Sequence, residues 1–314
     1  MIDAEALLTA ARRPLVIGMG GGGDVVGALA TAEACRLYHG AAPLVGGVTW
    51  ERRVIDPRPG PRLIDDIEGG RRLSACVLAA GPDTHAGEVV FAEAHMSRFL
   101  GEPVLLVDPH PGPEGIAAGL AEAADAVQAD LIVLIDVGGD ALAHGHEPGL
   151  ASPLCDSLML AAAARLQASG RQVVAGVFGV GCDGELTVDE VIERVSEVAA
   201  GGGLAGVRGI TEPIADRLEA AIHEVPTEAS AMAVRCFRGD TGTAEIRRGL
   251  RTVVLTPLGA LTIFVDPQRA VDSAARLAKA VMDAAHMEEA NDTLNSLGVR
   301  TELDLERETA AQSR

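Results

Sequence analysis

Two aspartates with a flexible spacer follow one of the most apolar runs in the chain. Residues 131–135 read Leu-Ile-Val-Leu-Ile, and Asp136-Val-Gly-Gly-Asp140 comes directly after them. Carboxylates this close repel each other, which raises the pKa of a carboxyl group unless a cation or a hydrogen-bond network compensates. Because oxygen ligands suit Mg²⁺, Mn²⁺ or Ca²⁺, the loop predicts that Asp136 and Asp140 hold a divalent cation. In the alternative, Asp140 caps the next turn and Asp136 accepts hydrogen bonds from loop amides.

A glycine-rich loop near the start of the chain could hold an anion. Residues 18–24 read Gly-Met-Gly-Gly-Gly-Gly-Asp, between a predicted strand at 14–18 and a predicted helix at 24–39. The pattern satisfies G-x-G-x-x-G, in which backbone N–H groups at a helix start hold a phosphate. The predicted substrate contacts in this loop are Gly20, Gly21, Gly22 and Gly23.

Asp24, at the end of this loop, indicates a cation rather than a dinucleotide. Its negative charge at a helix start would repel a pyrophosphate unless a cation or an N–H pair intervenes. With a cation, Asp24 joins Asp136 and Asp140 as a candidate metal ligand. A dinucleotide site also expects an acid about 20 residues further on, whereas the nearest candidate, Glu51, lies 28 residues after Gly23. In the alternative, Asp24 is a helix N-cap and the glycines only allow a tight turn.

A third loop, residues 179–187, follows a predicted strand at 173–178 and again combines glycines with acids. Thr187 and Glu190 form a capping-box pattern for the next helix. This leaves Asp183 and Glu185 as candidates for general acid–base catalysis. Gly181 in the same loop is a candidate substrate contact.

Two more polar residues belong to the segment that follows Asp140. His144, in the run His-Gly-His-Glu, is a candidate proton carrier at the crevice. An ordinary hydrogen-bonding role is equally open, and metal ligation is less favoured because the spacing matches no zinc motif. Ser152 precedes Pro153 at the start of a predicted helix, where it can act as N-cap, and it is also a candidate substrate contact.

The elements that must position these loops alternate between strand and helix. Apolar runs predict strands at 14–18, 42–49, 75–80, 104–107, 131–135 and 173–178, and helical spacing predicts helices at 24–39, 88–99, 114–126 and 152–168. This order is typical of an α/β protein with a Rossmann-like, doubly wound, mostly parallel sheet and helices on both faces. Because parallel strands end at one edge of a sheet, we expect the loops that follow them to form one polar crevice.

Past residue 184 the pattern changes to a C-terminal helical and hairpin extension. Helices are predicted at 188–199 and 213–223, and residues 251–266 suggest two strands around 257–260, as an antiparallel edge or a contact between copies of the chain. The sequence predicts one α/β domain over 1–314, with a core at about 1–200, an extension at about 201–300 and a frayed tail at 305–314. The long connection at 51–72 could cover the site.

Composition argues against several classes of protein. With 26 basic and 45 acidic residues, the chain has a net charge of −19, which opposes binding to nucleic acid or to an anionic membrane surface. Its apolar runs are far shorter than the roughly 20 residues of a membrane-spanning helix. The N-terminus carries no recognisable secretion signal, and the five cysteines include no C-x-x-C pair. We therefore expect a cytoplasmic protein with reduced thiols. The one lysine, Lys279, follows an alanine, so a P-loop is absent.

Four segments resemble a known family. They read GGGGDVVGALATA (20–32), WERRVIDPRPGPR (50–62), IDVGGDALAHGHEPGLASPLCDSLML (135–160) and GVGCDGELT (179–187). Over nearly the whole chain they resemble the prokaryotic DUF1152 family, a domain of unknown function. The resemblance implies an α/β fold and brings no established activity. Residues 136–140 are also locally similar to the aspartate loop of calcium-dependent nucleoside hydrolases, although that loop has an adjacent aspartate pair where this chain has Asp140-Ala141.

Together these features predict a metal-assisted enzyme that acts on a small anionic substrate, namely a nucleoside, nucleotide or sugar phosphate, by hydrolysis or group transfer. Two alternatives are a non-catalytic nucleotide-binding or sensing module in the same crevice and an NAD(P)-dependent oxidoreductase. In the leading interpretation Asp24, Asp136 and Asp140 hold the ion. The partners are then small molecules, and a homo-oligomer is left open.

Overall fold

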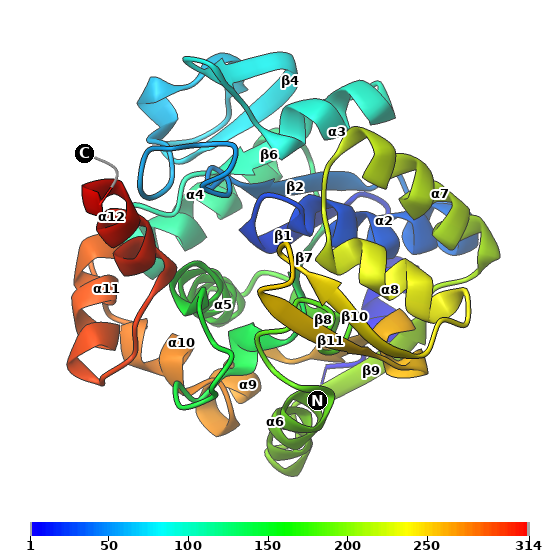
Figure 1. Cartoon of the computed structure of the whole chain (residues 1–314). Helices are drawn as coiled ribbons and strands as arrows, with labels where there is room; N and C mark the ends of the chain where they lie inside the picture. Colours follow the sequence, from blue (N-terminus) through cyan, green and yellow to red (C-terminus); the bar gives the residue numbers. More distant parts are fainter. Residues whose placement is uncertain (1, 313–314) are drawn as a thin grey trace.

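Five parallel strands form the centre of a ten-stranded sheet in the computed structural model, which describes residues 2–312 (Figure 1). In chain order they are β1 (Pro14–Gly21), β2 (Leu44–Val48), β6 (Val104–Val107), β7 (Leu131–Val137) and β8 (Val173–Phe178). Across the sheet they lie in the order β6, β2, β1, β7, β8, with every adjacent pair parallel. This is the 3-2-1-4-5 order of Rossmann-like folds, so the predicted α/β fold is confirmed.

Antiparallel strands extend the sheet at both edges. Beyond β6 lie β4 (Val77–Ala86), β3 (Glu68–Arg72) and the short β5 (Val89–Val90), and beyond β8 lie β12 (Leu261–Val265) and β9 (Leu204–Gly209). The strand predicted at 75–80 is part of β4, but it runs antiparallel to β6. A hairpin with β3, and not a helical crossover, leads the chain into it.

The two strands predicted within 251–266 do not pair with each other. β11 (Arg251–Leu255) forms a separate hairpin with β10 (Gly242–Ile246), whereas β12 joins the main sheet between β8 and β9. The short 3-10 helix η3 (Pro257–Ala260) redirects the chain between β11 and β12. The C-terminal extension therefore supplies both a sheet edge and an independent hairpin.

Helices cover both faces of the sheet. One face carries α4 (Gly112–Ala126), α5 (Pro153–Ala168), α6 (Val188–Ala200), α9 (Pro267–Ser273), α10 (Arg276–Val281), α11 (Met287–Ser296) and α12 (Glu302–Gln312). The other carries α1 (Ala4–Ala10), α2 (Asp24–His39), α3 (Ala92–Leu100), α7 (Glu212–Glu224) and α8 (Ala229–Phe237). Successive residues of β1 show the result, because Leu15 and Ile17 pack into the first core and Val16 into the second. Among residues 2–312, no helix combines the length and apolar character needed to cross a bilayer.

The tail is helical, not frayed, over residues 305–312. Leu303 of α12 is buried, and Glu306 accepts hydrogen bonds from Trp50 Nε1 at 3.2 Å and from the Gly60 N–H at 2.7 Å. These contacts with the connection after β2 hold the helix in place, and its polar sequence gives no sign of them. Residues 313 and 314, which were also predicted to fray, lie outside the described part of the chain.

The connection predicted at 51–72 is packed into the molecule. It contains the 3-10 helix η1 (Ile64–Asp66) and ends in β3. Arg62 pairs with the buried Asp56 through two hydrogen bonds of 2.6 and 2.7 Å. Arg53 donates to the backbone carbonyl of Glu306 at 2.9 Å. The connection and α12 therefore form one continuous wall.

Candidate active site

The loops that follow β1, β2, β7 and β8 open into one cavity of about 480 Å³. The cavity lies beside β1 and β7, where the strand order reverses and where open α/β sheets bind ligands. The start of α5, the β10–β11 hairpin and α12 complete its walls. The loops that were expected to share one edge of the sheet therefore do meet.

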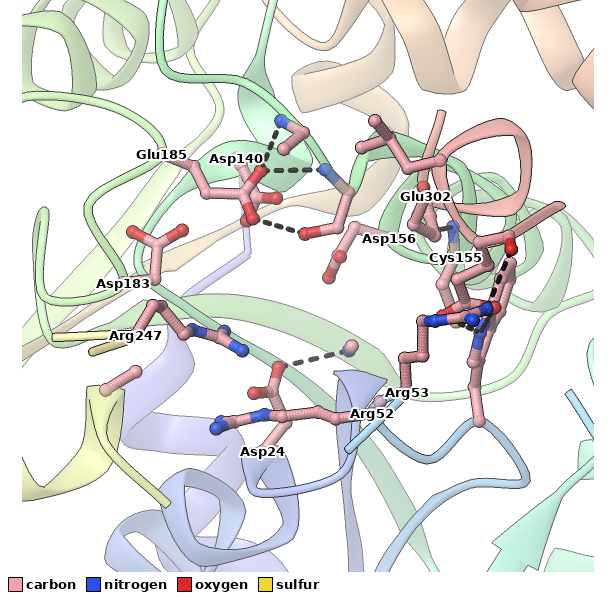
Figure 2. Close-up of a pocket in the computed structure, with 18 of the residues that line it drawn as sticks. Asp24, Arg52, Arg53, Asp140, Cys155, Asp156, Asp183, Glu185, Arg247 and Glu302 are labelled. Atoms are coloured by element: carbon pink, nitrogen blue, oxygen red, sulfur yellow. Dashed lines mark hydrogen bonds between the residues drawn. The ribbon is translucent and has the colours of Figure 1, made fainter. Parts of the chain in front are cut away.

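Acidic side chains outnumber arginines around this cavity (Figure 2). The acids are Asp24, Glu51, Asp140, Asp156, Asp183, Glu185, Glu302 and Glu306, and the arginines are Arg52, Arg53, Arg247 and Arg251. Buried carboxylates in such excess are costly unless protons or cations neutralise them. The composition of the wall suits a cation together with an anionic ligand.

The first acidic group, which we call the aspartate triad, consists of Asp24, Asp136 and Asp156. One carboxylate oxygen from each lies within 4.8 Å of the others. Asp24 accepts a hydrogen bond from the Gly20 N–H at 3.1 Å, and Asp136 Oδ2 accepts one from the Ala141 N–H at 3.2 Å. Asp136 Oδ1 and Asp156 Oδ1 are buried and have no hydrogen-bond partner in the described part of the chain. Oxygen ligands arranged in this way suit a hard divalent cation.

The second acidic group, Asp140, Asp183 and Glu185, also brings three carboxylate oxygens within 4.8 Å, but a positive charge already faces it. Arg251 pairs with Glu185 at 2.8 Å. Glu185 also accepts hydrogen bonds from the Ser152 N–H at 2.8 Å and from the Ser152 hydroxyl. Glu185 is thus fully engaged, so this group is the weaker candidate for a cation.

Burial shifts the pKa values of these acids. It raises the pKa of Asp24 to about 7, with the negative charge of Asp136 as the next cause, and it raises the pKa of Asp136 to about 6. It also raises the pKa of Glu302 to about 8. For Glu185, burial is outweighed by Arg251 and by hydrogen bonds, so the pKa is lowered. Near neutral pH the triad therefore retains protons that a bound cation would displace.

We expect the metal-free protein to lose stability as the pH rises from 6.5 to 8.5. The pKa values of about 7 for Asp24 and about 8 for Glu302 exceed the ordinary carboxyl value of about 4. The native state then binds more protons than the unfolded chain in this window, so the free energy of unfolding falls with pH. The lowered pKa values of His95 and His144 act in the opposite direction only below about 6.5. The pKa of Cys236, lowered to about 7 mainly by a hydrogen bond with Cys182, opposes the fall within this window. This one thiol is outweighed because burial also raises the pKa values of Asp140, Asp156 and Asp183.

Thermal melts in EDTA across this pH range measure the effect. Mn²⁺ should raise Tm more at pH 8.5 than at pH 6.5, because fewer protons must leave the triad. A metal-free Tm that climbs with pH over the same range would contradict the desolvated environment of Asp24 and Glu302.

The loop after β7 needs glycine at two positions. Gly138 and Gly139 have φ angles of 129° and 122°, which other residues rarely adopt. A Cβ on Gly138 would lie 2.2 Å from the carboxyl carbon of Asp183. The missing side chain lets the loop after β8 approach closely, and the Gly181 N–H donates to the Gly138 carbonyl at 2.8 Å.

Gly138→Ala should therefore lower the free energy of unfolding by about 1–3 kcal/mol, through backbone strain and contact with Asp183. Gly170→Ala is a matched control, since Gly170 has a φ of 89° but open space where its Cβ would lie. Urea denaturation of both variants separates the two causes. Equal losses in the two variants would show that the approach of Asp183 is not tight.

The structure brings most of the predicted site residues to the cavity. Those that line it are Asp24, Asp140, Asp183, Glu185, Gly20, Gly21 and Ser152, and Asp136 completes the triad behind them. Gly22, Gly23 and Gly181 are not among the lining residues. Ser152 takes the N-cap position of α5, but its hydroxyl donates to Glu185 and not to the helix backbone.

The glycines of the first loop accommodate protein atoms. A Cβ on Gly21 would lie 2.1 Å from the Trp50 carbonyl oxygen, and one on Gly23 would lie 2.3 Å from the Thr227 side chain. The Gly20 N–H is already donated to Asp24. These contacts account for Gly20, Gly21 and Gly23 without a ligand, so the glycine pattern by itself does not indicate an anion site.

His144 lies outside the cavity. Its ring contacts Arg194, and its Nε2 is 3.0 Å from Glu197 of α6. The side chain is buried, and burial, followed by Arg194, lowers its pKa. Glu147 closes the loop by accepting hydrogen bonds from the N–H groups of residues 144–146. The loop thereby turns toward α6, and the predicted role of His144 as a proton carrier at the crevice has no geometric support.

Several charged residues that line the cavity were not identified from the sequence as candidate site residues. Among them are Asp156, Arg52, Arg247, Arg251 and Glu302. A signal existed for Asp156, because it lies in the first turn of a helix that starts at the carboxyl edge of the sheet. Glu302 accepts hydrogen bonds from the N–H groups of Leu154 and Cys155, at 3.0 and 2.8 Å, and so caps α5 from a distant part of the chain.

Comparison with known families gives one match. A family model described as a protein of unknown function (DUF1152) matches residues 15–310. The chain belongs to the DUF1152 family. The resemblance seen in the four sequence segments is thereby confirmed, and every residue that lines the cavity falls within the DUF1152 match. No curated protein and no solved structure matches this DUF1152 protein significantly. The chemistry of the cavity must therefore be argued from its geometry.

Proposed function

We propose that this DUF1152 protein is a metal-dependent enzyme that acts on a small anionic molecule by hydrolysis or group transfer. In this proposal Asp24, Asp136 and Asp156 hold a divalent cation. The observation that carries it is the pair of buried oxygens, Asp136 Oδ1 and Asp156 Oδ1, that lack hydrogen-bond partners within residues 2–312. A buried polar atom without a partner costs free energy, and a divalent cation between the three carboxylates would remove that cost.

Residues on the other walls would supply the remaining chemistry. A divalent ion at the triad polarises a substrate oxygen or lowers the pKa of a bound water. Asp183 is the candidate general base, since it lines the cavity, its Oδ1 has no partner in the described chain, and burial raises its pKa. Glu185 would act as a positioning residue, because Arg251 and Ser152 occupy its carboxylate.

The geometry favours this function over dinucleotide-dependent redox chemistry. A Rossmann pyrophosphate site requires free backbone N–H groups at the start of the first helix. Here Asp24 occupies that position and accepts the Gly20 N–H. Its negative charge would repel a pyrophosphate. The anionic part of a substrate is better placed near the arginines that line the cavity.

Calorimetric titration of EDTA-treated protein with Mn²⁺, Mg²⁺ and Ca²⁺ tests the cation site. Each ion that binds should also raise Tm, and at equal concentration the ion that binds more tightly should raise it more. Turnover is then measured on a panel of nucleosides, nucleoside monophosphates and sugar phosphates, with and without the ion. Failure of all three ions to bind would contradict the proposal. Ion binding without turnover of any panel member would favour a binding or sensing module instead.

A further inference from the structure

Two arginines from distant segments of the chain line the part of the cavity next to Asp24. Arg52 belongs to the connection after β2 and Arg247 to the turn of the β10–β11 hairpin, and both line the cavity. Figure 2 shows both side chains on the same side of the central space as Asp24, with Asp140, Asp156 and Glu185 across it. Both positive charges counteract the rise in the pKa of Asp24. The fold has therefore gathered two cationic groups beside the predicted cation ligands.

Neither guanidinium group is fully paired. Both share one acidic partner, Glu228, at 3.7 Å from Arg52 and 3.8 Å from Arg247, which is longer than a hydrogen bond. Arg247 Nε is buried and donates to no group in the described chain. When Asp24 is engaged by a cation, Glu228 is the carboxylate that lies within 4 Å of both guanidinium groups, and Glu51 acts on Arg52 from further away. An additional anion between them would satisfy both the charge and the unused N–H donors.

The backbone fixes the position of Arg247. Arg247 and Arg248 have φ angles of 54° and 57°, the left-handed region that residues with side chains rarely adopt. The Arg247 N–H donates to Glu228 Oε1 at 3.0 Å. Strained conformations of this kind persist where surrounding contacts hold them, often at ligand-binding positions. Here the contact with Glu228 holds the turn that presents Arg247 to the cavity.

We infer that Arg52 and Arg247 bind a phosphoryl group of the substrate, which would lie between these two arginines and the cation at the aspartate triad, so that the substrate is a phosphate ester. The position of the cation in this inference rests on the proposed function. A phosphoryl group has three outer oxygens, so two can accept from the guanidinium groups while the third faces the ion. A carboxylate has two oxygens and cannot serve all three partners separately. Burial, followed by the positive charge of Arg247, lowers the pKa of Arg52 to about 10. A bound dianion would offset the repulsion between the two arginines.

Inorganic phosphate is the probe for this site. Calorimetry of the full-length, Mn²⁺-loaded protein should show phosphate binding, and Arg52→Gln and Arg247→Gln should each weaken it at least tenfold while Mn²⁺ still binds. Arg36→Gln is the matched control, because Arg36 is a partly exposed arginine on α2 that pairs with Glu102 outside the cavity. Its phosphate affinity should equal that of the wild type. Where a glutamine variant fails to fold, lysine at the same position keeps the charge but removes the two-pronged donor geometry.

The outcomes separate this inference from the proposed function. Equal phosphate affinity in the wild type, Arg52→Gln and Arg247→Gln would overturn the inference, and so would acetate binding as tight as phosphate. Mn²⁺ binding without phosphate binding would also overturn it, while the proposed cation site would stand. Phosphate binding that depends on both arginines, in a protein that binds no divalent ion, would support the inference and contradict the proposed function.

Discussion

Asp136→Asn is expected to abolish the rise in Tm that the proposed function predicts for the wild-type protein in Mn²⁺. Asp136 is 1% exposed and forms the triad with Asp24 and Asp156, so the change removes one charged ligand from the triad. At a free Mn²⁺ concentration of 100 Kd, the stabilisation lost is about 2.7 kcal/mol. Without the ion, the variant should be at least as stable as the wild type, because repulsion among buried carboxyl groups decreases.

Thermal melts of EDTA-treated protein over a series of Mn²⁺ concentrations measure this effect. Asp283→Asn is the control, because that side chain is 97% exposed and lies outside the cavity. It should respond to Mn²⁺ as the wild type does. If Asp136→Asn responds to Mn²⁺ as the wild type does, the triad is not the cation site. The group of Asp140, Asp183 and Glu185 would then be the next to test.

Arg251→Met is expected to lower the free energy of unfolding by about 3–5 kcal/mol. The side chain of Glu185 is 2% exposed and pairs with Arg251 at 2.8 Å. Asp183 and Asp140 lie beside it, and Arg251 is the arginine that offsets their negative charge. Removal of the guanidinium group leaves these carboxylates buried without a positive partner, which costs more than an exposed ion pair of the same length.

A double variant tests the cause. Arg251→Met combined with Glu185→Gln should recover part of the loss, because the second change neutralises the charge that the first leaves unpaired. Arg171→Met, which breaks an exposed pair with Asp125, should change stability little. Urea denaturation of the wild type and the variants gives the coupling free energy. Strictly additive effects at positions 251 and 185 would contradict the ion pair as the source of the stability.

The parallel core could be predicted because its strands other than β2 are apolar runs followed by a helical pattern. That order also places Asp24, Asp136, Asp140 and Asp183 at the carboxyl edge of the sheet, which is where the structure has them. Strand direction outside the core could not be predicted. The apolar character of β4 is the same in either direction, and only its hairpin with β3 makes it antiparallel to β6.

The cationic side of the cavity could not be predicted from local sequence. Arg52 and Arg247 are two of many arginines, and their neighbours in the chain mark neither as a ligand. Their proximity depends on how a long connection and a separate hairpin pack over the sheet edge, which is a tertiary property. In the glycine loop, by contrast, the sequence pattern matches a ligand-binding motif, but protein contacts already explain the glycines. The Trp50 carbonyl oxygen and the Thr227 side chain occupy the space that a Cβ would need at Gly21 and Gly23.

The capping of α5 by Glu302 determines when this cavity can form during synthesis. Asp24 through Glu185 leave the ribosome at least 117 residues before Glu302 does. Until then the first turn of α5 lacks the carboxylate that accepts its N–H groups, and one wall of the cavity is missing. Until Glu302 has been synthesised, the acids of the other walls are therefore open to water on this side, and under the proposed function they would hold an ion only weakly. An ion bound as proposed would be held tightly only by chains that already contain Glu302, and shorter nascent chains would not compete for it.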